Sequence, residues 1–138
     1  MTGLGSINVS FDTRDARRWL GQYRQWSQRA ASHAQRVVAH ELLRDAALYT
    51  PVLTGALRDS GRVEDVPTFD QSVMAVRVVF GSFEVIYARI QHEKPFNHPS
   101  LGFYGAAKFL ERPLLHNYAF YQQLFLVEYE LAMRQISN

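Results

Sequence analysis

The sequence contains no cysteine, which excludes disulfide scaffolds, thiolate metal sites and cysteine nucleophiles. Lysine is nearly absent as well, since 13 of the 15 basic residues are arginine. No apolar run approaches the roughly 20 residues that a membrane-spanning helix requires, so we expect no membrane partner. The chain has 138 residues, of which 47% are hydrophobic and 20% charged, and this balance is typical of one globular domain.

The short motifs that accompany common catalytic chemistry are also missing. There is no Gly-x-Ser-x-Gly nucleophile elbow, no phosphate-binding Gly-Lys-Ser/Thr loop and no complete dinucleotide fingerprint. His33 and His40 are seven residues apart, too far for a His-Glu-x-x-His zinc arrangement. The group His92, Glu93 and His98 could offer ligands, but no further ligand follows at a supporting spacing. We therefore predict a protein that is not an enzyme and has no metal or cofactor.

Charge is distributed unevenly along the chain. Residues 1–62 carry nine basic and five acidic side chains, whereas residues 63–138 carry six and eight. A dedicated duplex-DNA binder usually has a denser basic stripe than this. Because arginine pairs bidentately with carboxylates and stacks on aromatic rings, an arginine-rich, lysine-poor surface suits protein interfaces at least as well.

Hydrophobic periodicity predicts an α+β domain over residues 12–138, preceded by a flexible N-terminal arm over residues 1–11. Apolar residues recur every three or four positions over about 12–49, which predicts a long amphipathic helix. Thr50-Pro51 should end it, because the residue before proline is pushed out of the helical region. A second helix is expected over about 113–136.

Between the two helices the sequence predicts a small, mainly antiparallel sheet on which both helices pack. Its expected strands are residues 62–67, 72–80 and 83–90. Shared periodicity predicts that the core is a single cluster. Its expected members are Trp19, Tyr23, Val37, Val38, Leu57, Val76, Val78, Tyr118 and Phe125.

Residues 94–107 form a long stretch without a predicted helix or strand, and long loops in small domains are usually functional. This stretch contains Phe96, Phe103 and Tyr104, which are costly to leave in water. We predict that it is mobile in the free subunit and docks on a neighbouring protein during assembly. The alternative is a loop that packs on its own sheet and is ordered throughout.

Three segments occur in an order that carries a family resemblance. They are TPVLTGALRDS at residues 50–60, YARIQHE at residues 87–93 and AKFLERPL at residues 107–114. Their order resembles the pattern of the tail-component family of tailed bacteriophages. In that family a long helix is followed by the motif Pro-x-x-Thr-Gly-x-Leu-Arg-x-Ser and then by strands. The motif Tyr-Ala-x-x-x-x-Glu, a loop and Phe-Leu come next, before a final helix. The matching motif positions are Thr54, Gly55, Leu57, Arg58, Tyr87, Ala88, Glu93, Phe109 and Leu110. Where the family often has glycine soon after the glutamate, this chain has Lys94-Pro95-Phe96.

The resemblance implies a structural virion protein of the neck or tail-completion type, made in the host cytoplasm and placed at the head–tail junction. It implies a homo-oligomeric ring whose partners are portal-side head-completion proteins, tail-side proteins and the genomic DNA passing through the lumen. Arginines of the first helix are then expected to face acidic residues of a neighbouring subunit. The expected interface residues are Arg17, Arg24, Glu84, Glu93, Phe96, Phe103, Tyr104 and Glu111.

A small nucleic-acid-binding module that uses the arginine-rich helix is the alternative function. Trp19 and Trp26 would then stack on bases, although their spacing suits core packing better. Strong, salt-dependent DNA binding by the isolated monomer would favour this alternative. Neighbouring genes that encode portal or tail proteins would favour the virion role.

Overall fold

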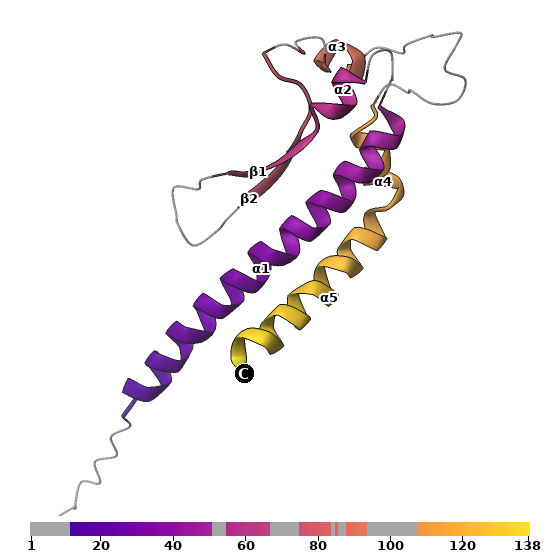
Figure 1. Ribbon diagram of the computed structural model, residues 1–138. Helices are drawn as coiled ribbons and strands as arrows, with labels where there is room; N and C mark the ends of the chain where they lie inside the picture. The colour runs from indigo at the N-terminus through magenta and orange to yellow at the C-terminus, as the bar shows by residue number, and fades with distance from the viewer. Residues whose placement is uncertain (1–11, 51–54, 67–74, 84, 86–87, 94–107) are drawn as a thin grey trace, which may run out of the picture.

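The computed structural model describes residues 12–50, 55–66, 75–83, 85, 88–93 and 108–138. Within this part of the chain the elements are, in order, α1 (Arg14–Tyr49), α2 (Ala56–Asp59), β1 (Arg62–Val66), β2 (Ala75–Val79), α3 (Ala88–Glu93), α4 (Glu111–His116) and α5 (Tyr118–Ser137). Two long helices with a small antiparallel sheet confirm the predicted α+β class (Figure 1). The predicted N-terminal arm and the loop 94–107 lie outside the described residues.

Helix α1 is one unbroken helix of 36 residues, about 54 Å long at 1.5 Å per residue. Asp12 precedes it, and the Oδ1 atom of Asp12 accepts a hydrogen bond from the backbone N–H of Arg14 at 3.0 Å. The helix ends at Thr50 as predicted, with an extended backbone at this residue. Thr50 is buried, and its hydroxyl donates at 2.8 Å to the Ala46 carbonyl, which also accepts the Thr50 backbone N–H at 3.0 Å.

The sheet lies against one side of α1 (Figure 1). Strands β1 and β2 form an antiparallel pair in which Val63 faces Val78 and Glu64 faces Arg77. An ion pair joins the sheet to the helix, since Arg36 of α1 donates to Asp65 of β1 through Nε at 3.1 Å and through Nη2 at 2.7 Å.

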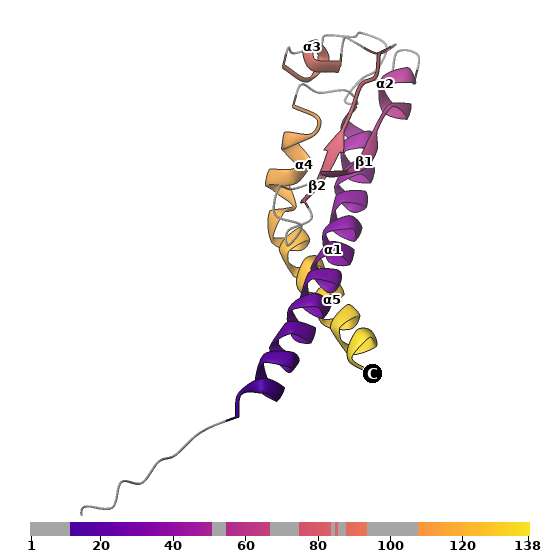
Figure 2. The same cartoon turned by 90° about the vertical axis from the view of Figure 1, so that its left-hand side faces the viewer.

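Helix α5 packs antiparallel along another side of α1 (Figures 1 and 2). The Tyr121 hydroxyl of α5 donates to Asp45 Oδ2 at 2.6 Å, and the hydroxyls of Ser27 and Tyr129 lie 2.9 Å apart. The helices then separate towards the end of α5, and α1 continues beyond it (Figure 2). No helix within the described ranges is both long and apolar enough to span a membrane.

The buried positions of α1 are all alanine. They are Ala30, Ala34, Ala39 and Ala46. Small side chains allow neighbouring elements to approach the helix backbone closely. Ala30 and Ala34 lie one turn apart on one side of the helix. Ala39 and Ala46 lie on roughly the opposite side, so alanine provides the buried positions on two sides of α1.

A separate core, called here the head cluster, lies at the C-terminal end of α1. It consists of the buried Leu57, Val85, Ala88 and Phe109, with Phe80 and Leu110 packed against them. The rings of Phe80 and Phe109 meet edge-on, with centroids 5.1 Å apart. Leu57 is therefore a core anchor, as its place in the sequence predicts.

The single core cluster expected from periodicity is wrong. Trp19 is 55% exposed and Tyr118 is 56% exposed, and Tyr23 is exposed as well. Trp19 and Tyr23 stand on the stretch of α1 that extends past α5, where no described element covers them. The remaining predicted members apart from Leu57 are half-buried. They are Val37, Val38, Val76, Val78 and Phe125.

Two predicted elements also differ from the structure. Residues 88–90, expected in a third strand, begin helix α3. A short apolar run fits a strand or a buried helical turn equally well, so periodicity does not separate the two. The predicted last helix is interrupted at Asn117, whose backbone at φ −106° and ψ 17° is not helical and divides α4 from α5.

Candidate interaction surfaces

The motif residues that carry the family resemblance meet in the head cluster. Leu57 comes from the first motif, Ala88 from the second, and Phe109 and Leu110 from the third. Gly55 begins α2 with a φ of +84°, a conformation that favours glycine. Three segments that are far apart in sequence thus build one core, and this explains their residue types by packing and not by reactivity.

The motifs include three further residues, Arg58, Thr54 and Tyr87. Arg58 is exposed on α2. Thr54 and Tyr87 lie outside the described residues.

Two acidic residues expected at a subunit interface converge on one lysine of their own subunit. The Lys108 Nζ atom lies 2.8 Å from Glu93 Oε2 and 3.4 Å from Glu111 Oε2. The backbone N–H of Lys108 also donates to the His92 carbonyl at 2.7 Å. The hydrogen bond from Lys108, and then the one from His92, hold the pKa of Glu93 below its usual range. Glu93 therefore joins α3 to the start of α4, and about half of its side chain remains exposed.

The other predicted interface residues divide into two groups. Arg17 and Arg24 are exposed on α1. Glu84, Phe96, Phe103 and Tyr104 lie outside the described residues.

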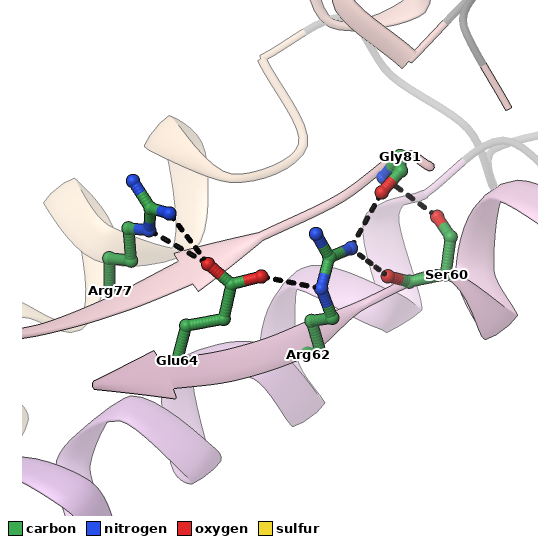
Figure 3. Close-up of polar contacts among 5 residues, drawn as sticks. All are labelled: Ser60, Arg62, Glu64, Arg77 and Gly81. Carbon is green, nitrogen blue, oxygen red and sulfur yellow. Dashed lines mark hydrogen bonds and ion pairs between the residues drawn. The ribbon is translucent and has the colours of Figure 1, made fainter. Parts of the chain in front are cut away.

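An arginine–glutamate network crosses the outer face of the sheet (Figure 3). Glu64 of β1 accepts from Arg77 Nε at 2.9 Å and from Arg62 Nε at 2.6 Å. Hydrogen bonds from Arg77 and Arg62 lower the pKa of Glu64. Arg62 Nη1 also donates to the Gly81 carbonyl at 2.6 Å, and the Gly81 N–H donates to Ser60 Oγ at 2.8 Å. Sequence reasoning missed this network because its cross-strand pairs depend on the strand register.

Two histidines of the described chain, His33 and His92, have pairing or packing roles. His33 Nε2 lies 3.4 Å from Glu128 Oε2 across the α1–α5 seam. The His92 ring meets Phe109 edge-on, with centroids 5.1 Å apart. No group of three or more possible metal ligands occurs among the described residues.

An apolar trough lies between α1, β2 and the α4–α5 helices. Two adjoining hollows, of about 480 and 330 Å³, share Val38 and Phe125 in their linings. Leu42 and Val76 line it on the sheet side. Leu114, Tyr118 and Leu126 line it on the other side, and all three side chains are exposed. The trough is therefore a concave surface whose rim presents large apolar groups to water.

The N-terminal third of α1 is a second unusual surface. Residues 14–25, called here the projecting segment, are exposed throughout and extend past α5 (Figures 1 and 2). Trp19, Leu20 and Tyr23 lie in water, and the Trp19 and Tyr23 rings stack with centroids 5.4 Å apart. A surface helix of a finished globular domain normally turns such residues towards the core.

Helix α5 carries exposed apolar residues on a further side. Phe120, Val127 and Leu131 are exposed there, and with Leu124 they recur at intervals of four, three and four residues. This stripe does not line the trough. Helix α5 is therefore apolar on more sides than the packing against α1 covers.

Comparison of the chain with protein-family models, with curated proteins and with solved structures finds no match. The resemblance to phage tail components therefore depends on the three motifs and their order. The surfaces described above provide the remaining basis for a functional proposal.

Proposed function

We propose that the protein is a structural subunit that assembles with further copies of itself into a closed ring. The observation that carries this proposal is the large apolar surface left in water on the projecting segment and the trough rim. Burial of such surface favours association by about 25 cal/mol per Å², and contiguous exposed apolar patches usually mark interaction sites. A ring needs two different contact surfaces on each subunit, and this chain offers a protruding one and a concave one.

The proposal extends to the place of the ring. We assign it to the head–tail connection of a tailed bacteriophage, between portal-side head-completion proteins and tail-side proteins, with genomic DNA passing through the lumen. The order of the three sequence motifs supports this assignment. Their convergence in the head cluster also supports it, because a shared core is what a common fold would require.

The first test is the oligomeric state of the purified protein. Sedimentation velocity over a wide concentration range should show a discrete oligomer, and electron microscopy should show closed rings. Arg17→Glu with Arg24→Glu should weaken assembly while far-ultraviolet circular dichroism stays unchanged. Arg58→Glu with Arg89→Glu is the matched control, because it makes the same charge change on exposed residues away from α1. A wild-type protein that stays monomeric at every concentration contradicts the proposal.

One observation favours nucleic-acid binding as a second candidate function. Four arginines of α1 have no carboxylate partner among the described residues, whereas Arg36 and Arg44 are paired. These four are Arg17, Arg18, Arg24 and Arg29. Four phosphate contacts would give a log–log salt dependence of duplex-DNA binding with a slope of about −3.6. Fluorescence anisotropy with labelled DNA measures that slope, and no binding at low salt rejects this candidate.

A further inference from the structure

We infer that the projecting segment of one subunit lies in the apolar trough of the next subunit. This inference rests on the proposed ring and specifies its contact. The occupant is a second copy of this chain, and the two surfaces in contact are different. The contact is therefore head-to-tail, which is the type that closes into rings.

The projecting segment has the form of a helix that docks in a groove. Ala16, Trp19 and Tyr23 of the segment recur at intervals of three and four residues, which places them on one helix face, and the half-buried Trp26 follows three residues later on the same face. The same face continues into Ala30, which is buried in the subunit's own core. Groove-docking helices use anchors at this spacing, and tryptophan and tyrosine are the side chains most often found as energetic anchors.

The projecting segment cannot occupy the trough of its own subunit. The trough is lined by α1 itself from Gln35 to Leu42. Residue 25 lies ten residues before Gln35 on the same unbroken helix, which separates them by about 15 Å along a rigid rod. The segment also points away from the rest of the molecule (Figure 1). Its partner must therefore be another molecule.

The dimensions of the two surfaces agree. The rim on α5 runs from Tyr118 to Leu126, which is about 12 Å of helix. Ala16 to Tyr23, the part of this face that lies in the projecting segment, spans about 10.5 Å of α1. A stripe of two turns thus meets a trough wall of two turns.

Charge favours contact between unlike surfaces. The projecting segment carries four arginines and one aspartate, whereas α5 carries Glu128, Glu130 and a single arginine, Arg134. Two projecting segments packed on each other would bring arginines of like charge together, which disfavours a symmetric contact. A segment packed beside α5 of another subunit brings opposite net charges together.

Two double variants separate the two surfaces. Trp19→Gln with Tyr23→Gln alters the segment and leaves the trough intact. Tyr118→Gln with Leu126→Gln alters the trough rim and leaves the segment intact. Val127→Gln is the matched control. Val127 is next to Leu126 in sequence and similarly exposed, at 47% for Val127 and 57% for Leu126, but Val127 does not line the trough. Circular dichroism and thermal melting check that each variant is folded.

The inference predicts a specific mixing result in sedimentation velocity. Each double variant alone should be monomeric, with self-association weakened at least about tenfold. An equimolar mixture should form a one-to-one heterodimer, because only one intact contact remains. Val127→Gln should assemble like the wild type.

Three results would overturn the inference without touching the proposed function. The first is a wild type that assembles while the mixture stays monomeric. The second is one double variant that still assembles alone, because each variant lacks one of the two proposed surfaces. The third is loss of assembly in Val127→Gln but not in the trough variant. A monomeric wild type instead overturns the proposed ring itself.

Cross-linking gives a second, independent readout. Because the chain contains no cysteine, Leu20→Cys in one preparation and Leu126→Cys in another are unique attachment points. A bis-maleimide linker added to the mixture should give mainly the 20–126 heterodimer. Homodimers linked through two copies of residue 20 or of residue 126, in excess of the heterodimer, contradict the proposed contact.

Discussion

The two parts of α1 are built by opposite rules. From residue 26 onwards the buried positions are alanines, so that α5 and the sheet approach the helix closely. In residues 14–25 the large side chains Trp19, Leu20 and Tyr23 lie in water. The longer part therefore packs within the subunit through its smallest residues, and the N-terminal third exposes large ones.

In the proposed ring, this difference separates folding from assembly within a single helix. The subunit's own stability depends on the head cluster and on the α1–α5 seam, where side chains are buried. The projecting segment adds length and aromatic surface that this core does not use. Substitutions in the two regions should accordingly act on different measurements.

The largest expected effect is at Phe109, which is 1% exposed and central to the head cluster. Phe109→Ala should lower the free energy of unfolding by roughly 3–5 kcal/mol, because it removes a buried ring and leaves a cavity. Trp19→Ala should change it by about 0.5 kcal/mol or less, as for an exposed position. Urea denaturation of dilute, monomeric protein measures both values. Equal losses for the two variants would remove the distinction between the regions.

Gly81 should give the next largest effect. Its φ is +101°, and an added Cβ would lie 2.9 Å from the Ala88 Cβ atom and 3.2 Å from the Val85 carbonyl oxygen. Gly81→Ala should therefore destabilise the protein by about 1–3 kcal/mol through backbone strain and a forced shift of α3. Urea denaturation measures the loss. An unchanged midpoint would show that the head cluster tolerates repacking.

Tyr121 should make stability depend on pH in the alkaline range. Burial, together with the hydrogen bond to Asp45, raises the pKa of Tyr121 to about 12. The protonated hydroxyl is thus favoured in the folded state, so its contribution is complete below about pH 10 and is lost as pH rises towards 12. Two pKa units correspond to about 2–3 kcal/mol.

The matched comparison for this pH effect uses two phenylalanine variants. Tyr121→Phe should flatten the fall in unfolding free energy between about pH 10 and 12. Tyr118→Phe should leave the fall in place, since Tyr118 is on the same helix but exposed. If the wild type and Tyr121→Phe lost the same unfolding free energy over this pH range, the loss could not be assigned to Tyr121 at the α1–α5 seam.

Periodicity predicted α1, the strand pair and the anchor Leu57, and Pro51 predicted the end of α1 at Thr50, because these features depend on local sequence. The exposure of Trp19 and Tyr23 was not predictable in this way. Trp19 and Ala30 share a helix face, and periodicity identifies the face without showing how far along the helix a partner covers it. The partners of Glu64 and Glu93 likewise depend on strand register and on the approach of Lys108 from a distant segment.

The smallest expected effect, at Gly21, sharpens the comparison within α1. Glycine in a helix interior costs about 1 kcal/mol relative to alanine, and an added Cβ at Gly21 would meet no atom within 4 Å. Gly21→Ala should therefore stabilise the projecting segment by up to about 1 kcal/mol. Amide hydrogen exchange of residues 17–25 in the monomer should slow about fivefold, while exchange in the head cluster stays unchanged.

Ala30→Gly, the reverse change at a buried position of the same helix, should lower the global free energy of unfolding, because Ala30 packs in the core. Unchanged or faster exchange in Gly21→Ala would show that the projecting segment is not an independent stretch of helix.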